Sequence, residues 1–376
     1  MITVVHVIAG LQAGGAESVL LRLVANDRGN RHVVISLTGE GKYGAPLRAA
    51  GVTVHALGMP RGRVTLHGWR ELRRLLAAYR PDVVQTWMYH ADLVGGVAAR
   101  LARVPRVCWG IRAGEILWTR GQRLTATIRV VNAALSWIVP DRVICNSARA
   151  AALHRSIGYS RRKLRVVPNG VDTTVFRPDA ARREQGRAAW RVPPGVPLLG
   201  AVGRDTPYKD HGTLIAALRS LRDQDVDFRF VFVGPGMDQQ NVSVAAQLAA
   251  AGLADRVQLC GERDDIAAVM SGLDVCVLSS VAEAFPSVLI ESMACGVPCV
   301  TTDVGDAAAI VADAGWIVPP RDPAALAAAM RRAIETWRDQ AAFAHRQAAS
   351  RDRVLARFTL GEMIRGFQQN WEGAGA

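Results

Sequence analysis

Strand-length apolar runs alternate with longer helical stretches along nearly the whole chain, and this alternation constrains the fold more than any other feature. In the first half, runs rich in Val, Ile and Leu predict strands at 3–9, 32–37, 52–57, 82–86, 106–109 and 142–145, with helices such as 16–26 and 69–79 between them. Strands joined by crossover helices form a parallel sheet. The first half is therefore expected to fold as an α/β domain.

A second series of the same kind predicts strands at 198–202, 228–233, 257–259, 275–278, 298–301 and 315–318. Pro168-Asn169-Gly170 and a polar, Pro-rich stretch separate the two series. The expected organisation is a first domain at 1–176, a linker at 177–196, a second domain at 197–353 and a C-terminal amphipathic helix within 354–376 that packs back on the first domain. Both domains are expected to be doubly wound and Rossmann-like. The loops after their strands are then expected to face one cleft.

The composition favours a cytoplasmic protein with two substantial cores. The chain has 376 residues. No apolar run approaches the ~18–20 residues that a membrane-spanning helix needs. The start of the chain, MITVVHVIA, predicts a buried strand rather than a secretory signal. Six cysteines form no C-x-x-C pair with metal-site spacing, so buried, reduced thiols and no metal site are expected.

The net charge of +13 is concentrated in the first half of the chain. Residues 1–180 carry 26 Lys and Arg against 10 Asp and Glu, whereas residues 181–376 carry 20 against 23. A basic domain suits nucleic acid, a phosphate-bearing substrate or an anionic membrane surface. An arginine-rich genome would explain the excess of basic residues equally well, because the chain contains only three lysines beside 43 arginines. Without a recognisable stacking or helix-turn-helix motif, a non-enzymatic nucleic-acid binder is the weaker alternative.

One stretch suggests contact with a membrane. Arg120, Arg123 and Arg129 lead into the apolar run 130–139, which contains Trp137. A cationic helix with aromatic residues can lie at a lipid surface. Packing inside the protein explains the same apolar residues equally well.

The first predicted strand leads into a glycine-rich loop and a helix. This loop contains Gly14-Gly15-Ala16-Glu17. Glycines let the backbone approach a ligand, and a helix N-terminus attracts phosphate. The spacing matches neither the dinucleotide fingerprint nor the nucleotide-triphosphate loop. An anion-binding loop and a simple tight turn both remain open.

Two cations follow the first strand of the second domain. Gly203-Arg204 ends this strand, and Lys209 stands five residues further on, before the next helix. Two cations on a strand-to-helix loop can hold a diphosphate and neutralise its charge as it leaves. A solvated surface pair is the alternative.

Two glutamates with seven residues between them lie at the start of a predicted helix. Glu283 follows the strand at 275–278, and Glu291 falls about one turn into the helix that Pro286 and Ser287 are expected to begin. The N–H groups around Ser287 and Val288 offer a second anion site. Paired carboxylates also occur in glycoside hydrolases, but a neighbouring pair of cations favours a phosphate-linked donor.

With these motifs, the chain resembles the retaining glycosyltransferases of family 4. The similarity rests on Gly14-Gly15-Ala16-Glu17, on Pro168-Asn169-Gly170-Val171-Asp172, on Gly203-Arg204 with Lys209, and on the glutamate pair, and it spans nearly the whole chain. The resemblance implies the GT-B fold, with acceptor recognition mainly in the first domain and donor binding mainly in the second. It implies hexosyl transfer from a nucleoside diphosphate sugar.

Residue roles follow from the resemblance only. Glu283 resembles the carboxylate that holds hydroxyls of the donor sugar, and Glu291 the one that takes the ribose hydroxyls. Arg204 and Lys209 resemble the diphosphate clamp, and the other donor-binding positions that the resemblance implies are Gly14, Gly15, Phe285, Pro286, Ser287, Val288, Arg263 and Asp264. Glu17 is assigned to the acceptor or the sugar.

The sequence departs from the family at one place. Many members carry a histidine on a first-domain loop, where this chain reads Val107-Cys108-Trp109-Gly110-Ile111-Arg112. Arg112 is expected to take a polar role there. His90 follows the preceding strand and is expected either to face the acceptor or sugar or to be a structural histidine.

The implied reaction needs no cofactor. The acceptor hydroxyl attacks on the face that the nucleoside diphosphate leaves, and the leaving phosphate helps to take the proton. Metal is expected to be dispensable, and Asp264-Asp265 are expected to cap the next helix. The implied acceptor is a glycan or a polyprenyl-diphosphate-linked sugar in cell-surface polysaccharide synthesis, at the cytoplasm or peripherally on the inner face of the membrane. A nucleotide-sugar 2-epimerase of the same fold is the alternative.

Overall fold

The computed structural model describes residues 1–12, 14–114 and 123–372, which form two compact units. Unit 1 comprises the chain up to Gly170 together with the segment that begins at Leu360, and unit 2 comprises Val171–Thr359. The chain therefore passes from one unit to the other twice. Across the described ranges, no helix is both long enough and apolar enough to span a bilayer.

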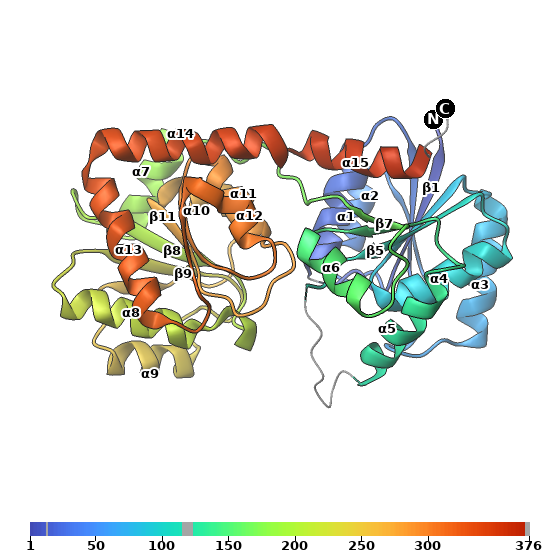
Figure 1. Cartoon of the computed structure of the whole chain (residues 1–376), viewed down its shortest axis with the longest axis horizontal. Coiled ribbons are helices and arrows are strands. Elements are labelled where there is room, and N and C mark those ends of the chain that lie inside the picture. Colours follow the sequence, from blue (N-terminus) through green and yellow to red (C-terminus); the bar gives the residue numbers. More distant parts are fainter. Residues whose placement is uncertain (13, 115–122, 373–376) are drawn as a thin grey trace. The chain divides into compact units, whose positions relative to one another are not determined.

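The described part of unit 1 is a seven-stranded parallel sheet with the order β3-β2-β1-β4-β5-β6-β7, covered by helices on both faces (Figure 1). Its strands are β1 (Thr3–Ile8), β2 (Arg31–Ser36), β3 (Thr53–Ala56), β4 (Val83–Trp87), β5 (Arg106–Ile111), β6 (Arg142–Cys145) and β7 (Leu164–Val166). Its helices are α1 (Gly15–Asn26), α2 (Gly44–Ala49), α3 (Leu66–Tyr79), α4 (Tyr89–Leu101), α5 (Arg123–Leu135), α6 (Ala148–Ser156) and α15 (Leu360–Glu372).

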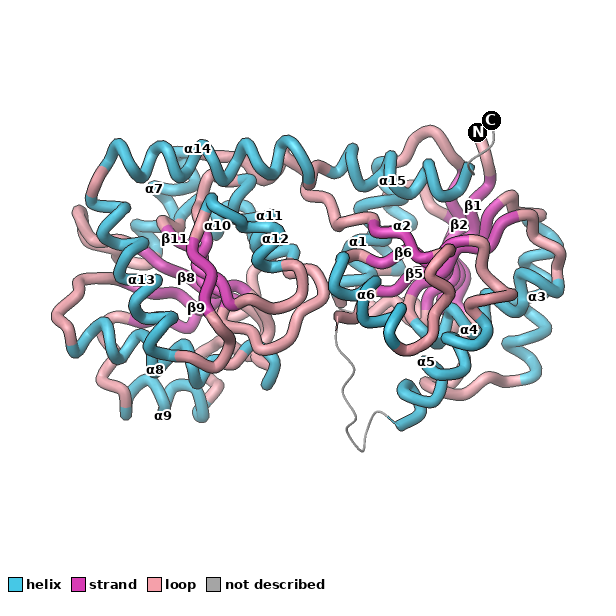
Figure 2. Tube along the Cα trace, in the orientation of Figure 1, coloured by secondary structure: helices cyan, strands magenta, loops and turns pink. Residues whose placement is uncertain are grey.

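Unit 2 repeats this architecture in its described residues, with a six-stranded parallel sheet of order β10-β9-β8-β11-β12-β13 (Figure 2). Its strands are β8 (Leu198–Val202), β9 (Arg229–Val233), β10 (Val257–Leu259), β11 (Val275–Leu278), β12 (Cys299–Thr302) and β13 (Trp316–Val318). Its helices are α7 (Ala180–Ala189), η2 (Pro207–Lys209), α8 (His211–Asp223), α9 (Val242–Ala250), α10 (Ile266–Gly272), α11 (Ser287–Ala294), α12 (Ala307–Val311), η3 (Ala312–Ala314), α13 (Pro323–Arg338) and α14 (Gln340–Arg357).

The apolar runs form strands because both faces of each sheet are covered. In β1, Val5 and Val7 belong to one hydrophobic core while Val4 and Ile8 belong to the core on the other face. Strands buried on both sides need continuous apolar sequence rather than alternation. Every predicted strand is present, and the predicted fold class is confirmed. The prediction missed β7, which is three residues long and places the exposed Arg165 at its centre.

In both sheets the chain reverses its direction of winding at one point. The reversal lies between β1 and β4 in unit 1 and between β8 and β11 in unit 2. Ligands of doubly wound sheets bind at such a point, beyond the carboxyl ends of the strands. The loops after these four strands are therefore the places where each unit can hold a ligand.

The segment predicted as a linker, 177–196, is instead part of unit 2. It contains α7, which packs on α10. Arg183 and Arg187 of α7 both bind the carboxylate of Asp274, whose side chain is fully buried before β11, and the Leu198 N–H donates to the same carboxylate at 2.7 Å. The polar residues that suggested a linker thus include arginines that form an ion-pair network inside unit 2.

The C-terminal helix predicted at 354–371 is two helices. α14 ends at Arg357 in unit 2, and α15 begins at Leu360 in unit 1. Phe358 leaves helical geometry, packs against Phe285 and accepts a hydrogen bond from the Val171 N–H through its carbonyl. Only Phe358 and Thr359 separate the two helices, and this short break explains why the sequence suggested one helix.

A chain of buried hydrogen bonds lies between β1, β2 and β4 of unit 1. The indole N–H of Trp87 donates to His6 Nδ1, so His6 must donate from Nε2 to His32 Nδ1 at 3.0 Å. His32 then donates from Nε2 to Asp27 at 3.1 Å. Gln368 of α15 also donates to Asp27. The chain thus fixes both histidine tautomers and ties α15 to the sheet.

This arrangement predicts a pH-dependent stability. Burial alone would raise the pKa of Asp27, but hydrogen bonds from His32, Asn30 and Gln368 outweigh it and lower the pKa from 3.8 to about 2. The resulting stability, about 2 kcal/mol, is present above pH 3.8 and is lost as the pH falls through 2. Urea unfolding between pH 2 and pH 5 should show this slope in the wild type and a reduced slope in Asp27→Asn. An equal slope in both proteins would contradict the assignment.

Candidate active site

The loops after β8 and β11 bring a lysine and a glutamate together in unit 2. The Lys209 ammonium lies 2.7 Å from Glu283 Oε1, and the Ser280 hydroxyl donates to the same oxygen at 2.9 Å. The two charged side chains are 22% and 18% exposed. A half-buried pair at the reversal point of the sheet offers a cation and a hydroxyl-binding carboxylate to one ligand.

Three hydrogen bonds to main-chain carbonyls fix the relative position of this pair. The Ser279 hydroxyl donates to the Lys209 carbonyl at 2.7 Å, and the Val281 N–H donates to the Tyr208 carbonyl at 2.8 Å. From the last residue of β12, the Thr302 hydroxyl donates to the Ser280 carbonyl at 2.6 Å. The geometry of the pair is therefore set by three strand ends rather than by the two side chains alone.

Glycines let the loops after β8 and β9 approach each other closely. A Cβ on Gly203 would lie 3.0 Å from Cε of Lys209, so the glycine lets the lysine side chain pass over the loop. A Cβ on Gly234, which has φ +145°, would lie 2.2 Å from the Gly203 carbonyl oxygen. The loops after β8 and β9 thus approach closely only because both positions lack a side chain.

Arg204, the other predicted clamp residue, lies exposed on the loop after β8. The adjacent Asp205 accepts a hydrogen bond from the Asn241 side chain at 2.8 Å, which anchors the loop. Arg204 and Lys209 therefore belong to one loop, as expected from the sequence.

Helix α11 carries the second predicted carboxylate. Pro286 is the N-cap rather than the first helical residue, and Ser287 and Val288 form the first turn. Glu291 lies in the middle of this helix and is half-buried. The Phe285 side chain is in the core against Phe358, with ring centroids 5.8 Å apart, so this residue can offer only its main chain to a ligand.

The loop after β10 contains Arg263 and Asp264. Arg263 makes two hydrogen bonds to Asp265, at 2.7 and 2.6 Å. These hydrogen bonds raise the pKa of Arg263 and lower the pKa of Asp265. Asp265 is the N-cap of α10 by position, but its side chain makes no capping bond. The predicted cap is thus wrong, because the carboxylate binds the arginine instead.

In unit 1, the glycine-rich loop leads directly into α1. Gly14 is the N-cap, and a Cβ there would lie 2.2 Å from Glu17 Oε2. Glu17 therefore folds back over Gly14, in the position that a capping-box glutamate takes. The absence of a side chain at Gly14 thus leaves room for the Glu17 carboxylate, whereas the space beside Gly15 is open.

His90 is the second residue of α4 and is half-buried. Burial and the nearby charge of Arg61 lower the pKa of His90. The preceding Met88 has φ 72° and ψ 157°, a conformation that costs energy for a residue with a side chain. His90 is thus presented at the end of β4 by a strained strand-to-helix turn.

Arg112, expected to take a polar role where many family members carry a histidine, is half-buried, and its guanidinium lies inside unit 1. Its guanidinium stacks over the Trp87 ring, 4.7 Å from the ring centroid, and donates to Asn169 Oδ1 at 2.6 Å. Burial lowers the pKa of Arg112 to about 10. The side chain therefore connects the end of β5 to the Pro168-Asn169-Gly170 segment.

Sequence reasoning missed the serines that support the lysine–glutamate pair. Ser279 and Ser280 directly follow β11, and their position at a strand end was the available signal. Within the described ranges, no group of three or more His, Cys, Asp or Glu residues is placed to hold a metal ion.

Two family descriptions match successive parts of the chain. "Glycosyltransferase Family 4" matches residues 13–175, and "Glycosyl transferases group 1" matches residues 196–336. The crystal structure of Anabaena HepE in complex with UDP-glucose superposes with a TM-score of 0.83 at 22% identity, over 98% of both chains. This similarity supports the fold.

Curated relatives include several bacterial glycosyltransferases. A glycogen synthase of Mycobacterium tuberculosis is 31% identical over 75% of this chain and 66% of its own. The UDP-Gal:alpha-D-GlcNAc-diphosphoundecaprenol alpha-1,3-galactosyltransferase of Escherichia coli is 26% identical over 62% of this chain and 60% of its own. With a lysine–glutamate pair at the reversal point of the second sheet and two family descriptions that together cover most of its length, the chain belongs to the group 1, family 4 glycosyltransferases.

Proposed function

We propose that this glycosyltransferase moves a hexosyl group from a nucleoside diphosphate sugar to a hydroxyl of a glycan or a polyprenyl-diphosphate-linked sugar, with retention of configuration. The observation that carries the proposal is the 2.7 Å contact of Lys209 with Glu283 at the ligand-binding edge of unit 2. The complex of HepE with UDP-glucose supports a nucleotide-sugar donor, and the galactosyltransferase that acts on a diphosphoundecaprenol-linked sugar supports a lipid-linked acceptor.

The proposed roles follow from charge and position. Lys209, with Arg204 on the same loop, neutralises the diphosphate as the bond to the sugar breaks. Glu283 binds hydroxyls of the donor sugar, and Glu291 binds those of the ribose. The main chain of Ser287 and Val288 at the start of α11 faces phosphate oxygens. The leaving phosphate takes the proton of the acceptor hydroxyl, so the reaction needs neither a protein base nor a metal ion.

Product stereochemistry and metal removal test these details together. NMR of the product formed from an α-linked donor sugar should show an α linkage, and the rate should be unchanged after treatment with EDTA. A β-linked product would contradict retention, and loss of activity that Mg²⁺ restores would contradict the role given to Lys209 and Arg204. Formation of a sugar epimer without acceptor would favour the isomerase alternative.

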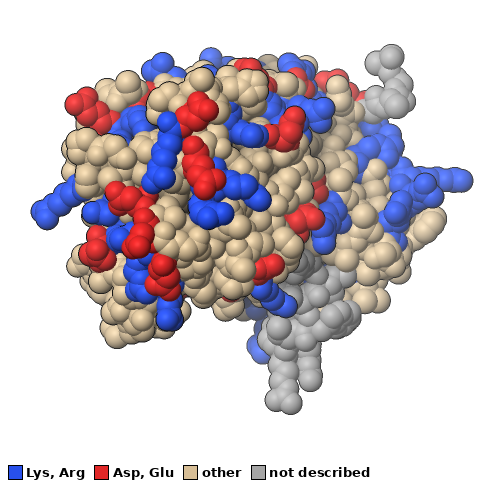
Figure 3. Space-filling view, turned by 60° about the vertical axis from the view of Figure 1, so that its left-hand side comes forward, with Lys and Arg blue, Asp and Glu red and all other residues tan. Residues whose placement is uncertain are grey.

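We further propose that the protein works in cell-surface polysaccharide synthesis, at the inner face of the cell membrane. The basic composition of the first half of the chain is consistent with a membrane that carries anionic lipids. On the face of the molecule seen in Figure 3, unit 2 interleaves acidic and basic side chains, in keeping with the balanced charge of the second half. Because the excess of basic residues lies in the first half of the chain, we place any membrane contact on unit 1.

A further inference from the structure

Helix α5 and the turn after it leave an apolar face uncovered on unit 1. Five large apolar side chains of this segment are 40–73% exposed: Leu124, Val130, Val131, Trp137 and Ile138. They recur at the spacing of one helical face, and Ala134, also exposed, lies between them. The opposite side of α5 is buried, with Ile128 and Ala133 in the hydrophobic core of unit 1. The helix is therefore anchored by one face and exposes apolar side chains on the other.

The apolar face extends onto the loop before α3. A Cβ on Gly62 would lie 3.2 Å from Cδ2 of Leu124, so this loop touches the start of α5. Val64 and Leu66, which follow Gly62, are also exposed. We refer to Val64, Leu66, Leu124, Val130, Val131, Ala134, Trp137 and Ile138 as the α5 face. An exposed apolar surface of this kind on a folded protein marks an interaction site.

Two hydrogen bonds hold Trp137 in place. Its indole N–H donates to the Gly158 carbonyl at 3.1 Å, and its own carbonyl accepts from the Lys163 ammonium at 2.6 Å. The ring is nevertheless 60% exposed. A tryptophan whose N–H is satisfied and whose ring faces solvent suits the boundary between water and lipid.

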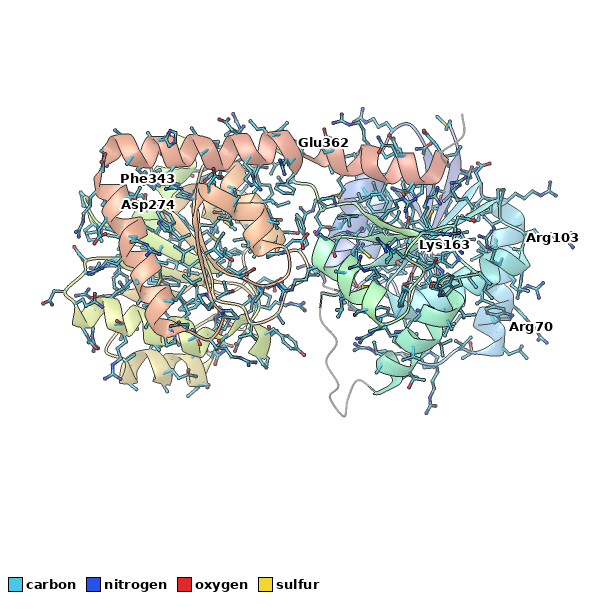
Figure 4. The ribbon with its side chains drawn as sticks, in the orientation of Figure 1. Arg70, Arg103, Lys163, Asp274, Phe343 and Glu362 are labelled. Atoms are coloured by element: carbon cyan, nitrogen blue, oxygen red, sulfur yellow. The ribbon has the colours of Figure 1, made fainter. Side chains whose placement is uncertain are left out.

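Basic side chains stand at both ends of the α5 face. Arg61 and Arg63 flank Gly62 at one end and are exposed. At the other end Lys163, labelled in Figure 4, binds the Trp137 carbonyl, and the exposed Arg161 and Arg162 precede it in the chain. A surface with apolar side chains between cations matches the chemistry of an anionic bilayer.

Asp141, an acid close to Lys163 in the described residues, is paired with an arginine. Asp141 follows the turn and lies 2.7 Å from Arg100. The rim cations described above are not those that the sequence singled out. Arg129 is buried with its guanidinium 5.1 Å from the Tyr89 ring centroid, and Arg120 and the side chain of Arg123 lie outside the described residues. The rim therefore consists of other residues than those that first suggested membrane contact.

We propose that the α5 face docks on a bilayer that contains anionic lipids, with Trp137 and Ile138 in the interfacial region and the flanking cations against lipid phosphates. A second copy of the chain would place these cations against each other, which opposes self-association through the same face. Arg61 also lies close enough to His90 for its charge to act on the imidazole. Given the proposed function, docking would therefore hold the end of β4 near the membrane surface, where a lipid-linked acceptor is presented.

Vesicle flotation tests the proposal with the full chain and without donor or acceptor. The wild type is compared with Trp137→Ser/Ile138→Ser on vesicles of equal parts phosphatidylglycerol and phosphatidylcholine, and on phosphatidylcholine alone. We expect binding only to the anionic vesicles and a loss of about ten-fold or more in the double variant, because two large side chains no longer enter the interface. Val242→Ser, which alters a side chain 77% exposed on α9 of unit 2, is the matched control and should bind as the wild type does.

The charge contribution is tested by Arg161→Glu/Arg162→Glu, which should weaken binding to the anionic vesicles and remove most of its salt dependence. Circular dichroism and activity on a water-soluble acceptor should be unchanged in both double variants. Wild-type protein that fails to float with anionic vesicles would overturn the proposal, as would equal binding by Trp137→Ser/Ile138→Ser. A dimer that this variant abolishes, without vesicle binding, would assign the face to a second copy. If the protein binds vesicles but transfers no sugar, the proposed docking surface is supported and only the proposed function is refuted.

Discussion

Replacing Lys209 with alanine is expected to lower kcat/KM for the nucleotide sugar about 10²–10³-fold, because the departing diphosphate loses a preorganised cation. Glu283→Gln keeps the shape of the side chain but removes the charge that binds Lys209 and the Ser280 hydroxyl, so we expect a loss of similar size. Steady-state release of nucleoside diphosphate measures both effects. The folded state should change little, because a partly exposed ion pair contributes only about 1 kcal/mol or less.

Two matched variants separate catalysis from general effects of charge. Lys163→Ala removes another lysine, and Glu335→Gln neutralises an exposed glutamate on α13. Both should keep wild-type rates on a water-soluble acceptor. If Lys209→Ala retains more than about a third of the wild-type kcat/KM, a difference of well under 1 kcal/mol in transition-state stabilisation, the role given to Lys209 is wrong.

Asp274→Ala is expected to destabilise the protein by about 3–5 kcal/mol. The carboxylate of Asp274, a residue labelled in Figure 4, is fully buried and accepts from Arg183, Arg187 and the Leu198 N–H. Its removal leaves two guanidinium groups and a main-chain donor without their acceptor, and it releases α7 from the amino end of β8. Urea unfolding followed by circular dichroism gives the change in free energy.

Asp223→Ala is the matched control for this variant. Asp223 lies on α8 of the same unit, pairs with Arg222 and is half exposed. An exposed pair contributes about 1 kcal/mol or less, so the control should stay near the wild type. Equal stability of Asp274→Ala and the wild type would show that the network does not hold α7 in place.

The strands of both sheets could be predicted because they are buried on two faces. Such strands need uninterrupted apolar runs, and β1 and β8 are examples that the sequence located with nearly correct bounds. The loop residues Lys209 and Glu283 could be predicted because they follow strands at the reversal point of the sheet. Their contact, however, depends on hydrogen bonds from the Ser279 hydroxyl and the Val281 N–H to main-chain carbonyls, which no spacing in the sequence encodes.

Tertiary contacts decided the features that the sequence did not indicate. The segment 177–196 is polar, but its arginines bind a buried aspartate more than 80 residues away in the chain. Arg112 stands at a strand end, as a ligand-binding residue would, yet Trp87 and Phe367 enclose its guanidinium. In both places a charged side chain has an internal partner that is distant in sequence, and local pattern cannot reveal such a partner.

Acceptor-dependent release of nucleoside diphosphate is the most direct test of the proposed transfer. The purified protein is incubated with uridine, guanosine and adenosine diphosphate sugars in turn, with and without a lipid extract of cell envelopes. We expect release from one donor only when acceptor is present, and its loss in Lys209→Ala and Glu283→Gln. No release from any donor, or conversion of a donor to its epimer without acceptor, would contradict the account.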